Sequence, residues 1–303
     1  MSGPVLISNS EIQTFKRCRR KWLLSTYRRL APNFRDVVGP LNFGTRIHAA
    51  LEAYYADGLD LLETHSKLIE TDRMWLLTEG RDLTKFEKEA ELGRIMLEGY
   101  LEWLAETGAD SDLEVISAEE KIAVPLFEGQ VELRAKLDMR IRRLRDGVRL
   151  FVDHKSSINP SDYTRGAHMD EQFLTYHVLE ACQKDREERC DGGMYNILKK
   201  VKRSVTARPP FYERLEVRHN ARSLDSMWYR LHGEITEIMK LRAALDSGAD
   251  HRQVAYPSPN KNCSWDCDFY AVCPMFDEDP AAAEQMIDQL YTEHDPYERY
   301  GTA

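Results

Sequence analysis

The segment that decides the fold is residues 138–155, DMRIRRLRDGVRLFVDHK. Apolar Val, Leu, Ile and Phe side chains are frequent on both sides of Asp146-Gly147, which predicts two strands joined by a turn. An Asp-Gly pair in this setting favours a two-residue type I′ hairpin, because both central residues must tolerate positive φ. The segment therefore predicts a β-hairpin with residues 146 and 147 as its loop.

This turn also predicts which side chains meet across the hairpin. Asp138 is expected opposite Lys155, and Asp153 on the same face at the diagonal position, roughly 7–8 Å away. Two carboxylates and one ammonium on one patch favour a divalent-cation site, since Mg²⁺ in proteins uses one or two carboxylates and keeps several waters. The alternative is a cross-strand salt bridge between Asp138 and Lys155 on a solvated face.

Composition bounds the class of protein. The chain has 303 residues, 42% hydrophobic and 31% charged, which is typical of a globular protein and excludes wholesale disorder. No apolar stretch approaches the roughly 18 residues of a membrane span, and residues 1–5 lack the pattern of a signal peptide. We expect one domain rather than two, a cytoplasmic location and no membrane partner.

The net charge of −9 discourages a nucleic-acid ligand, but the distribution of charge favours one. Residues 16–29 contain seven basic side chains and no acidic one, and residues 199–208 contain five and none. Residues 134–149 contain seven basic against two acidic side chains. Clustered cations bind phosphates whatever the total charge. The alternative for each cluster alone is a solvated face, but three together favour a polyanionic substrate.

The order of elements predicts a mixed α/β fold. Ser8 and Glu11 have the spacing of a capping box, which predicts a helix that runs through Cys18. Hydrophobic periodicity indicates the remaining elements. The predicted helices are 45–55, 61–80, 84–105, 170–184 and 224–245, and the predicted strands are 114–124, 131–144, 148–155, 193–198 and 211–217. Helices and strands in this order form a mixed sheet flanked by helices.

Four of the six cysteines form a second candidate metal site. Cys263, Cys267 and Cys273 are close in sequence, and Cys18 is the distant fourth ligand. Zinc and an iron–sulfur cluster both suit four thiolates, whereas the alternative is four unliganded thiols, since disulfides are rare in the cytosol. Ligation would join residues 1–30 and 255–280 into a clasp, followed by an acidic tail over 281–303.

Six motifs resemble those of one nuclease family and follow its order. They are Cys18 in FKRCRRKW, His48 in GTRIHAALE, Asp138, Asp153-His154-Lys155, Gln172 and Tyr176 in QFLTY, and the last three cysteines. Together they resemble the RecB-like nucleases of the PD-(D/E)XK superfamily. The resemblance is to the iron–sulfur-clasped branch, with its CRISPR-associated and phage exonucleases and AddB-type subunits. One departure is the spacing of Cys263 and Cys267, with three intervening residues where two are commoner.

The resemblance implies a restriction-endonuclease-like sheet and a set of site residues. Mg²⁺ or Mn²⁺ would be held by His48, Asp138, Asp153 and the backbone carbonyl of His154. Lys155 would orient a water or offset negative charge on the phosphate. Gln172 and Tyr176, four apart on one helix face, would lie beside the bound strand. The cysteines would bind a 4Fe-4S cluster, with Zn²⁺ as the alternative.

The implied function is a metal-dependent DNA exonuclease acting on single-stranded or frayed ends. Such an enzyme would serve recombination, repair or end-processing in a phage or prokaryote, alongside recombination or CRISPR-adaptation proteins. Two alternatives stay open. One is a non-catalytic DNA-binding or assembly module with a structural metal cluster, and the other is a zinc protein of another enzyme class whose hairpin is purely structural.

Overall fold

The predicted hairpin is present in the computed structural model, but its turn differs from the expectation. Strand β4 (Val131–Arg143) pairs antiparallel with β5 (Arg149–Ser157), with Met139 opposite Val152. The Arg143 N–H donates to the Val148 carbonyl at 2.8 Å and closes a loop of four residues, 144–147. Of its Asp-Gly pair only Gly147 has a positive φ. The Asp146 carboxylate accepts the N–H of Val148 at 3.2 Å, as in an Asx turn. The type I′ turn, with Asp138 opposite Lys155, is therefore wrong.

The error in register leaves the faces of the hairpin unchanged. The pairing is shifted by two residues, and side chains in a strand alternate with a period of two. Asp138 and Asp153 thus still lie on one face. Extended by one step beyond the last pair, Met139 and Val152, the register sets these two acids opposite each other.

The structure describes residues 3–34 and 36–301, and their backbone packs as two compact units. The larger unit comprises residues 36–122 and 136–224, and the smaller lies within 1–35, 123–135 and 225–303. Both are built from segments distant in sequence. A single domain stays a prediction. Among the described helices none is both long and apolar enough to cross a membrane.

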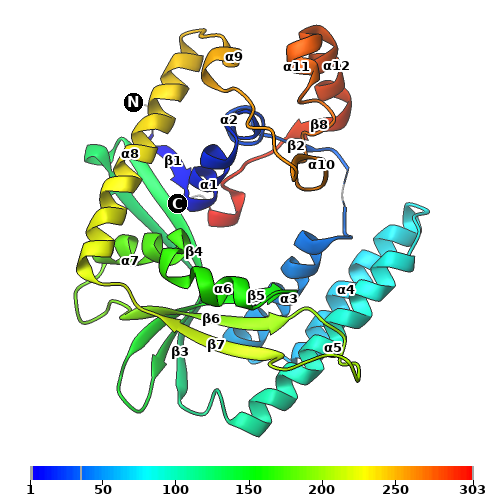
Figure 1. The fold of residues 1–303 in the computed structure, drawn as a ribbon, viewed down its shortest axis with the longest axis vertical. Helices are drawn as coiled ribbons and strands as arrows, with labels where there is room; N and C mark the ends of the chain where they lie inside the picture. The colour runs from blue at the N-terminus through cyan, green and yellow to red at the C-terminus, as the bar shows by residue number, and fades with distance from the viewer. Residues whose placement is uncertain (1–2, 35, 302–303) are drawn as a thin grey trace. The chain divides into compact units, whose positions relative to one another are not determined.

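The larger unit is a mixed sheet with helices on both faces. Strand β5 is parallel to β6 (Gly192–Lys199), and β6 is antiparallel to β7 (Tyr212–Val217). Strand β3 (Leu113–Leu126) pairs with β4. The helices are α3 (Pro40–Asp57), α4 (Leu61–Thr78), α5 (Thr84–Thr107), α6 (Ser161–Gly166) and α7 (Glu171–Gln183). Helices α4 and α5 are long and lie side by side (Figure 1).

Alternation along β6 assigns the two faces of this sheet. Tyr195 stacks on Phe173 of α7, with ring centroids 4.3 Å apart. The next residue, Asn196, donates to the hydroxyl of Tyr100 on α5 at 2.9 Å. Successive residues point to opposite faces, so α7 covers one face and α5 the other.

The smaller unit joins both ends of the chain. Strand β1 (Val5–Ser8) runs parallel to the first residues of β4, and β2 (Leu30–Pro32) pairs antiparallel with β8 (Tyr291–Glu293). Most of α8 (Ala221–Asp246) also belongs here. The other helices are α1 (Asn9–Arg17), α2 (Arg19–Trp22), α9 (His251–Val254), α10 (Cys263–Asp266), α11 (Met275–Glu278) and α12 (Pro280–Leu290). As predicted, Ser8 caps α1 by accepting the N–H of Glu11. The prediction that this helix runs through Cys18 is wrong, because the backbone of Cys18 is extended and α2 begins anew at Arg19.

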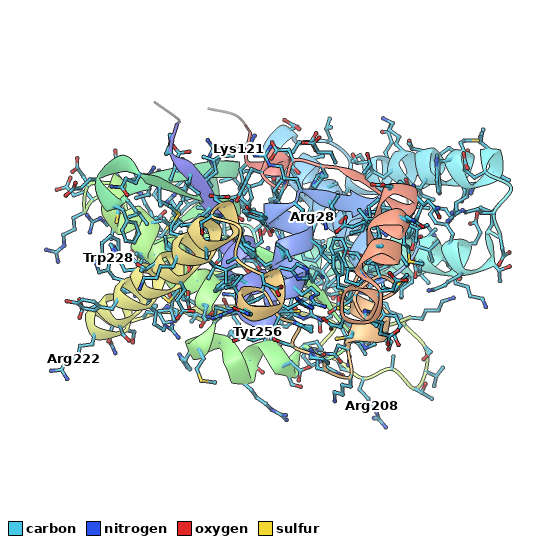
Figure 2. The ribbon with its side chains drawn as sticks, turned by 90° about the horizontal axis from the view of Figure 1, so that it is seen from above. Arg28, Lys121, Arg208, Arg222, Trp228 and Tyr256 are labelled. Atoms are coloured by element: carbon cyan, nitrogen blue, oxygen red, sulfur yellow. The ribbon has the colours of Figure 1, made fainter. Side chains whose placement is uncertain are left out.

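Cations of the first basic cluster are paired within the smaller unit. Lys16 contacts Glu234, Arg17 contacts Asp266 and Arg19 contacts Glu237, at 2.6–3.0 Å. Arg28 binds Glu284 in the acidic tail, and Arg20 binds Asp277, four residues before that tail begins. Figure 2 labels Arg28, which pairs with α12 through Glu284. The ion pairs of this cluster therefore join the N-terminal helices to C-terminal segments of the same unit.

Candidate active site

The site begins where the β4–β5 ladder ends. The last described pair is Met139 with Val152. Beyond it, the backbone N–H of His154 donates to the side chain of Asp138, with 2.9 Å between N and Oδ2. Strand β5 continues its pairing with β6 through Asp153 to Ser157. The two strands thus separate at the acids that the sequence predicted as metal ligands.

Asp153, Lys155 and Gln172 form one contact group on the α7 face. Nζ of Lys155 lies 2.5 Å from Oδ2 of Asp153 and 3.3 Å from Oε1 of Gln172. The Gln172 amide nitrogen donates to Oδ1 of Asp153 at 2.9 Å. Gln172 therefore holds the carboxylate and the ammonium in fixed relation, because its amide carries both an acceptor and a donor.

Gln172 is itself held from both sides. Its amide nitrogen also donates to the hydroxyl of Tyr176, at 2.7 Å, and this hydroxyl donates to the backbone carbonyl of Lys136 at 3.0 Å. The carboxylate of Asp170 caps α7 by accepting the N–H groups of Gln172 and Phe173. The two predicted residues thus connect α7 to β4 and β5.

His48 reaches the site from α3. Its Nδ1 lies 3.3 Å from Oδ2 of Asp138, the same oxygen that accepts the His154 N–H. The His154 side chain points to the opposite face, where it is buried and its Nδ1 lies 2.9 Å from the Asn196 amide nitrogen. Only the backbone of His154 contributes to the face that carries the acids.

Burial and neighbouring charges give the carboxylates of Asp138 and Asp153 different pKa values. Burial acts to raise the pKa of Asp138, but the hydrogen bond and charge of His48 outweigh it and leave this pKa well below its usual range. Burial raises the pKa of Asp153 to about 6, against the effect of Lys155. Burial acts to lower the pKa of Lys155, yet Asp153 raises it on balance. Lys155 is therefore a cation at neutral pH.

The side chains where β4 and β5 separate are of types that bind divalent cations. Asp138 and Asp153 offer carboxylate oxygens and His48 offers an imidazole nitrogen, which are ligand types that divalent cations accept. Oδ2 of Asp153 is buried and already meets one positive charge, the Lys155 ammonium at 2.5 Å. Among the described residues, however, no three His, Cys, Asp or Glu side chains are already gathered as ligands. Binding would require His48 and the two acids to close around the ion.

The four cysteines all lie in the smaller unit, half-buried and outside any disulfide. Backbone N–H groups approach two of the sulfurs. Those of Lys21 and Ser258 lie 3.5 and 3.4 Å from the sulfur of Cys18, and that of Asn260 lies 3.3 Å from the sulfur of Cys263. Burial raises the pKa of Cys267 and Cys273, and negative charge on Cys18 raises both further. In the described chain these thiols do not form a ready-made cluster site.

Several residues of the site have no separate signal in the sequence. Asp170 precedes an amphipathic helix, so the sequence could predict it as a helix cap. That this cap helps to hold Gln172 in the site depends on where α7 lies, which the sequence does not show. Asn196 and Arg214 come from β6 and β7, and neither belongs to a spaced motif. Only the pairing of β5, β6 and β7 brings them towards His154.

Comparison with known proteins gives a family and several structural neighbours. No curated protein matches the chain. A crystal structure from Eubacterium rectale, of a protein named provisionally as an exonuclease, superposes with a TM-score of 0.47 and 12% identity over 79% of this chain and 82% of that one. The model of the PD-(D/E)XK nuclease superfamily matches residues 6–274, which include the hairpin and all the site residues above. The chain belongs to the PD-(D/E)XK nuclease superfamily.

Proposed function

We propose that this nuclease is a Mg²⁺- or Mn²⁺-dependent DNA exonuclease that acts on single-stranded or frayed ends. The observation that carries the proposal is the meeting of Asp138, Asp153 and Lys155 where β4 and β5 separate. The preference for ends follows from the resemblance to the RecB-like exonucleases. The pathway would be recombination, repair or end-processing, with recombination or CRISPR-adaptation proteins as partners.

Each site residue has a distinct task in this proposal. His48, Asp138, Asp153 and the carbonyl of His154 would hold the cation, which supplies a water of lowered pKa and offsets charge on the phosphate. Lys155, already protonated, offsets developing negative charge rather than acting as a base. Gln172 keeps Asp153 and Lys155 at fixed separation, and Tyr176 keeps Gln172 in place.

Within the second basic cluster, Lys200 is the best candidate for a phosphate contact. Lys202 and Arg203 pair with Glu91 and Glu102. Lys200 instead lies over the ring of Phe43 on α3, 3.9 Å from its centroid. Its backbone N–H donates to the carbonyl of Ser157, at the end of the strand that carries Lys155. A DNA backbone entering the site would meet this ammonium. Arg208, in the following loop, points outward (Figure 2).

We also propose that Cys18, Cys263, Cys267 and Cys273 bind a 4Fe-4S cluster, with Zn²⁺ as the alternative. The backbone N–H groups near Cys18 and Cys263 support this proposal, because hydrogen bonds to sulfur favour thiolate ligands and tune clusters. Protein purified without oxygen should be brown with broad visible absorption, whereas a zinc protein would be colourless. Cys267→Ser should lower the melting temperature and metal content, and unchanged values for both would end the proposal.

The decisive experiment for the activity compares linear and circular DNA. End-labelled single strands and duplexes, and closed single-stranded circles, would be incubated with Mn²⁺, with Mg²⁺ or with EDTA. We expect loss of label from linear DNA with metal only, and intact circles. Cleaved circles would indicate an endonuclease. DNA binding with no cleavage in any metal would favour the non-catalytic assembly module, and full activity in EDTA would contradict metal dependence.

A further inference from the structure

A buried polar cluster lies beneath the site, on the opposite face of β5 and β6. The His154 side chain, with an exposed fraction of 3%, stacks on Tyr55 of α3, with ring centroids 5.7 Å apart and planes inclined by 13°. Its Nδ1 lies 2.9 Å from the amide nitrogen of Asn196, whose exposed fraction is 1%. A buried imidazole is therefore held by a stacked ring and one hydrogen-bonding partner.

Arg214 fixes the orientation of the Asn196 amide. The guanidinium Nε lies 3.4 Å from Oδ1 of Asn196, and a guanidinium can only donate. The amide oxygen of Asn196 must therefore face Arg214, which directs its NH₂ group towards His154. Nδ1 of His154 then accepts, so the neutral imidazole carries its proton on Nε2. Burial lowers the pKa of His154 to about 3, in accord with a neutral ring.

Arg214 is itself anchored by several groups. It donates to the carbonyl of Ala109 at 2.7 Å and to the carboxylate of Asp110 at 2.5 Å. The hydroxyls of Tyr55 and Tyr100 lie 3.2 and 3.1 Å from the same guanidinium. Tyr55 also donates to Asp110, at 3.0 Å. A buried network with its partners satisfied is rigid, so Asn196 has a fixed support.

His154 connects this network to the acids of the site. Its backbone N–H donates to Oδ2 of Asp138, and its chain neighbours are Asp153 and Lys155. A rotation of residue 154 about the strand axis would break the bond to Asp138 and turn both neighbouring side chains. The network thus restrains residues 153–155 of β5, which carry Asp153 and Lys155 on the face of the site.

We infer that Asn196 and Arg214 are positioning residues of the nuclease site, which act through His154 to fix the Asp138 carboxylate and the 153–155 segment. This inference rests on the proposed function. Partners that orient ligating groups typically contribute about 10–100-fold to metal affinity or activity. Asn196→Ala should therefore lower kcat by about 10–100-fold, leave KM for DNA nearly unchanged and raise the Mn²⁺ concentration needed for half-maximal rate.

The matched control is Leu97→Ala. Leu97 lies one turn before Tyr100 on α5, is fully buried in the same core and takes no part in the network. It should lower the melting temperature while the folded enzyme keeps its kcat. Rates would be measured well below both melting temperatures. If the two variants lose rate only in proportion to their loss of folded protein, the positioning role is refuted.

A second measurement does not depend on activity. Histidine-selective ¹⁵N NMR, with a His154→Gln variant for assignment, reports which ring nitrogen of His154 carries the proton. We expect Nε2–H in the wild type and Nδ1–H in Asn196→Asp, because a carboxylate only accepts. Nδ1–H in the wild type would overturn the network as described. A wild-type protein that cleaves no DNA but shows Nε2–H would refute the proposed function, and with it the catalytic role, while the network stands.

Discussion

The side-chain amide of Gln172 lies 2.9 Å from the Asp153 carboxylate that it holds, nineteen residues away in sequence. The same amide accepts from Lys155 through its oxygen. One helix residue therefore sets the distance between an acid and an ammonium of β5. Gln172 is therefore a part of the site, although it carries no charge. Its spacing from Tyr176 would also fit a glutamine on the surface of the helix.

The first prediction concerns this amide. Gln172→Ala should lower kcat by about 10–100-fold with KM for DNA little changed, because Asp153 and Lys155 lose their common partner. Tyr176→Phe, which removes only the hydroxyl behind Gln172, should cost less. Steady-state kinetics on an end-labelled strand would measure both. If kcat falls further in Tyr176→Phe than in Gln172→Ala, Tyr176 does not act through Gln172 and the prediction is contradicted.

The second prediction concerns Lys155. Lys155→Met keeps much of the volume but removes the positive charge, so cleavage should fall by at least about 10²-fold. The fold should persist, since protonation of Asp153 can remove the unpaired charge that the substitution leaves. Cleavage assays and circular dichroism would be compared with wild type. Wild-type turnover by this variant would end the assignment of Lys155 as a catalytic residue.

The third prediction is a dependence of metal affinity on pH. Burial raises the pKa of Asp153 to about 6, so below that pH a proton occupies the carboxylate that the metal needs. His48 must also lose a proton to bind the metal: burial acts to lower its pKa, but the hydrogen bond and charge of Asp138 raise it on balance. The concentration of Mn²⁺ for half-saturation should therefore rise as pH falls, by about tenfold per pH unit for each ligand that becomes protonated, and level off only above the pKa of His48. Titration calorimetry in buffers of different ionisation enthalpy would also detect the released proton. A half-saturation concentration independent of pH would contradict the shift.

The fourth prediction concerns stability. Arg140 and Glu180 form a buried ion pair, and the exposed fractions of their side chains are 2% and 1%. Arg140→Met should lower the free energy of unfolding by about 3–5 kcal/mol, because it leaves Glu180 buried without its partner. The double variant Arg140→Met/Glu180→Leu should recover part of that loss, because it removes the unpaired charge but also the acceptor of the Cys190 N–H, and Glu120 still lacks Arg140. Chemical denaturation would measure both, and a double variant no more stable than the single would contradict the pairing.

Local patterns predicted much of the secondary structure. The helix expected over 61–80 is Leu61–Thr78, and that expected over 170–184 is Glu171–Gln183. The cap at Ser8 is also as predicted. Such features depend on neighbouring residues and on a period of 3.6 or 2, both of which are visible in the sequence.

Charge was harder to interpret from sequence. The basic run over 16–29 favoured a phosphate ligand, but its cations pair with acids such as Glu234 and Asp277, more than two hundred residues away. Of the run over 199–208, Lys202 and Arg203 pair with α5. A local charge count cannot include partners that only the fold supplies.

The sequence by itself determined the family motifs and the common face of Asp138 and Asp153, because strand periodicity fixes a face even when the register is wrong by two residues. Only the tertiary structure decided the register, the place of Gln172 between Asp153 and Lys155, and the network from Arg214 to His154. These depend on contacts between residues far apart in the chain, and no local pattern records which side chains the packing of strands and helices brings together.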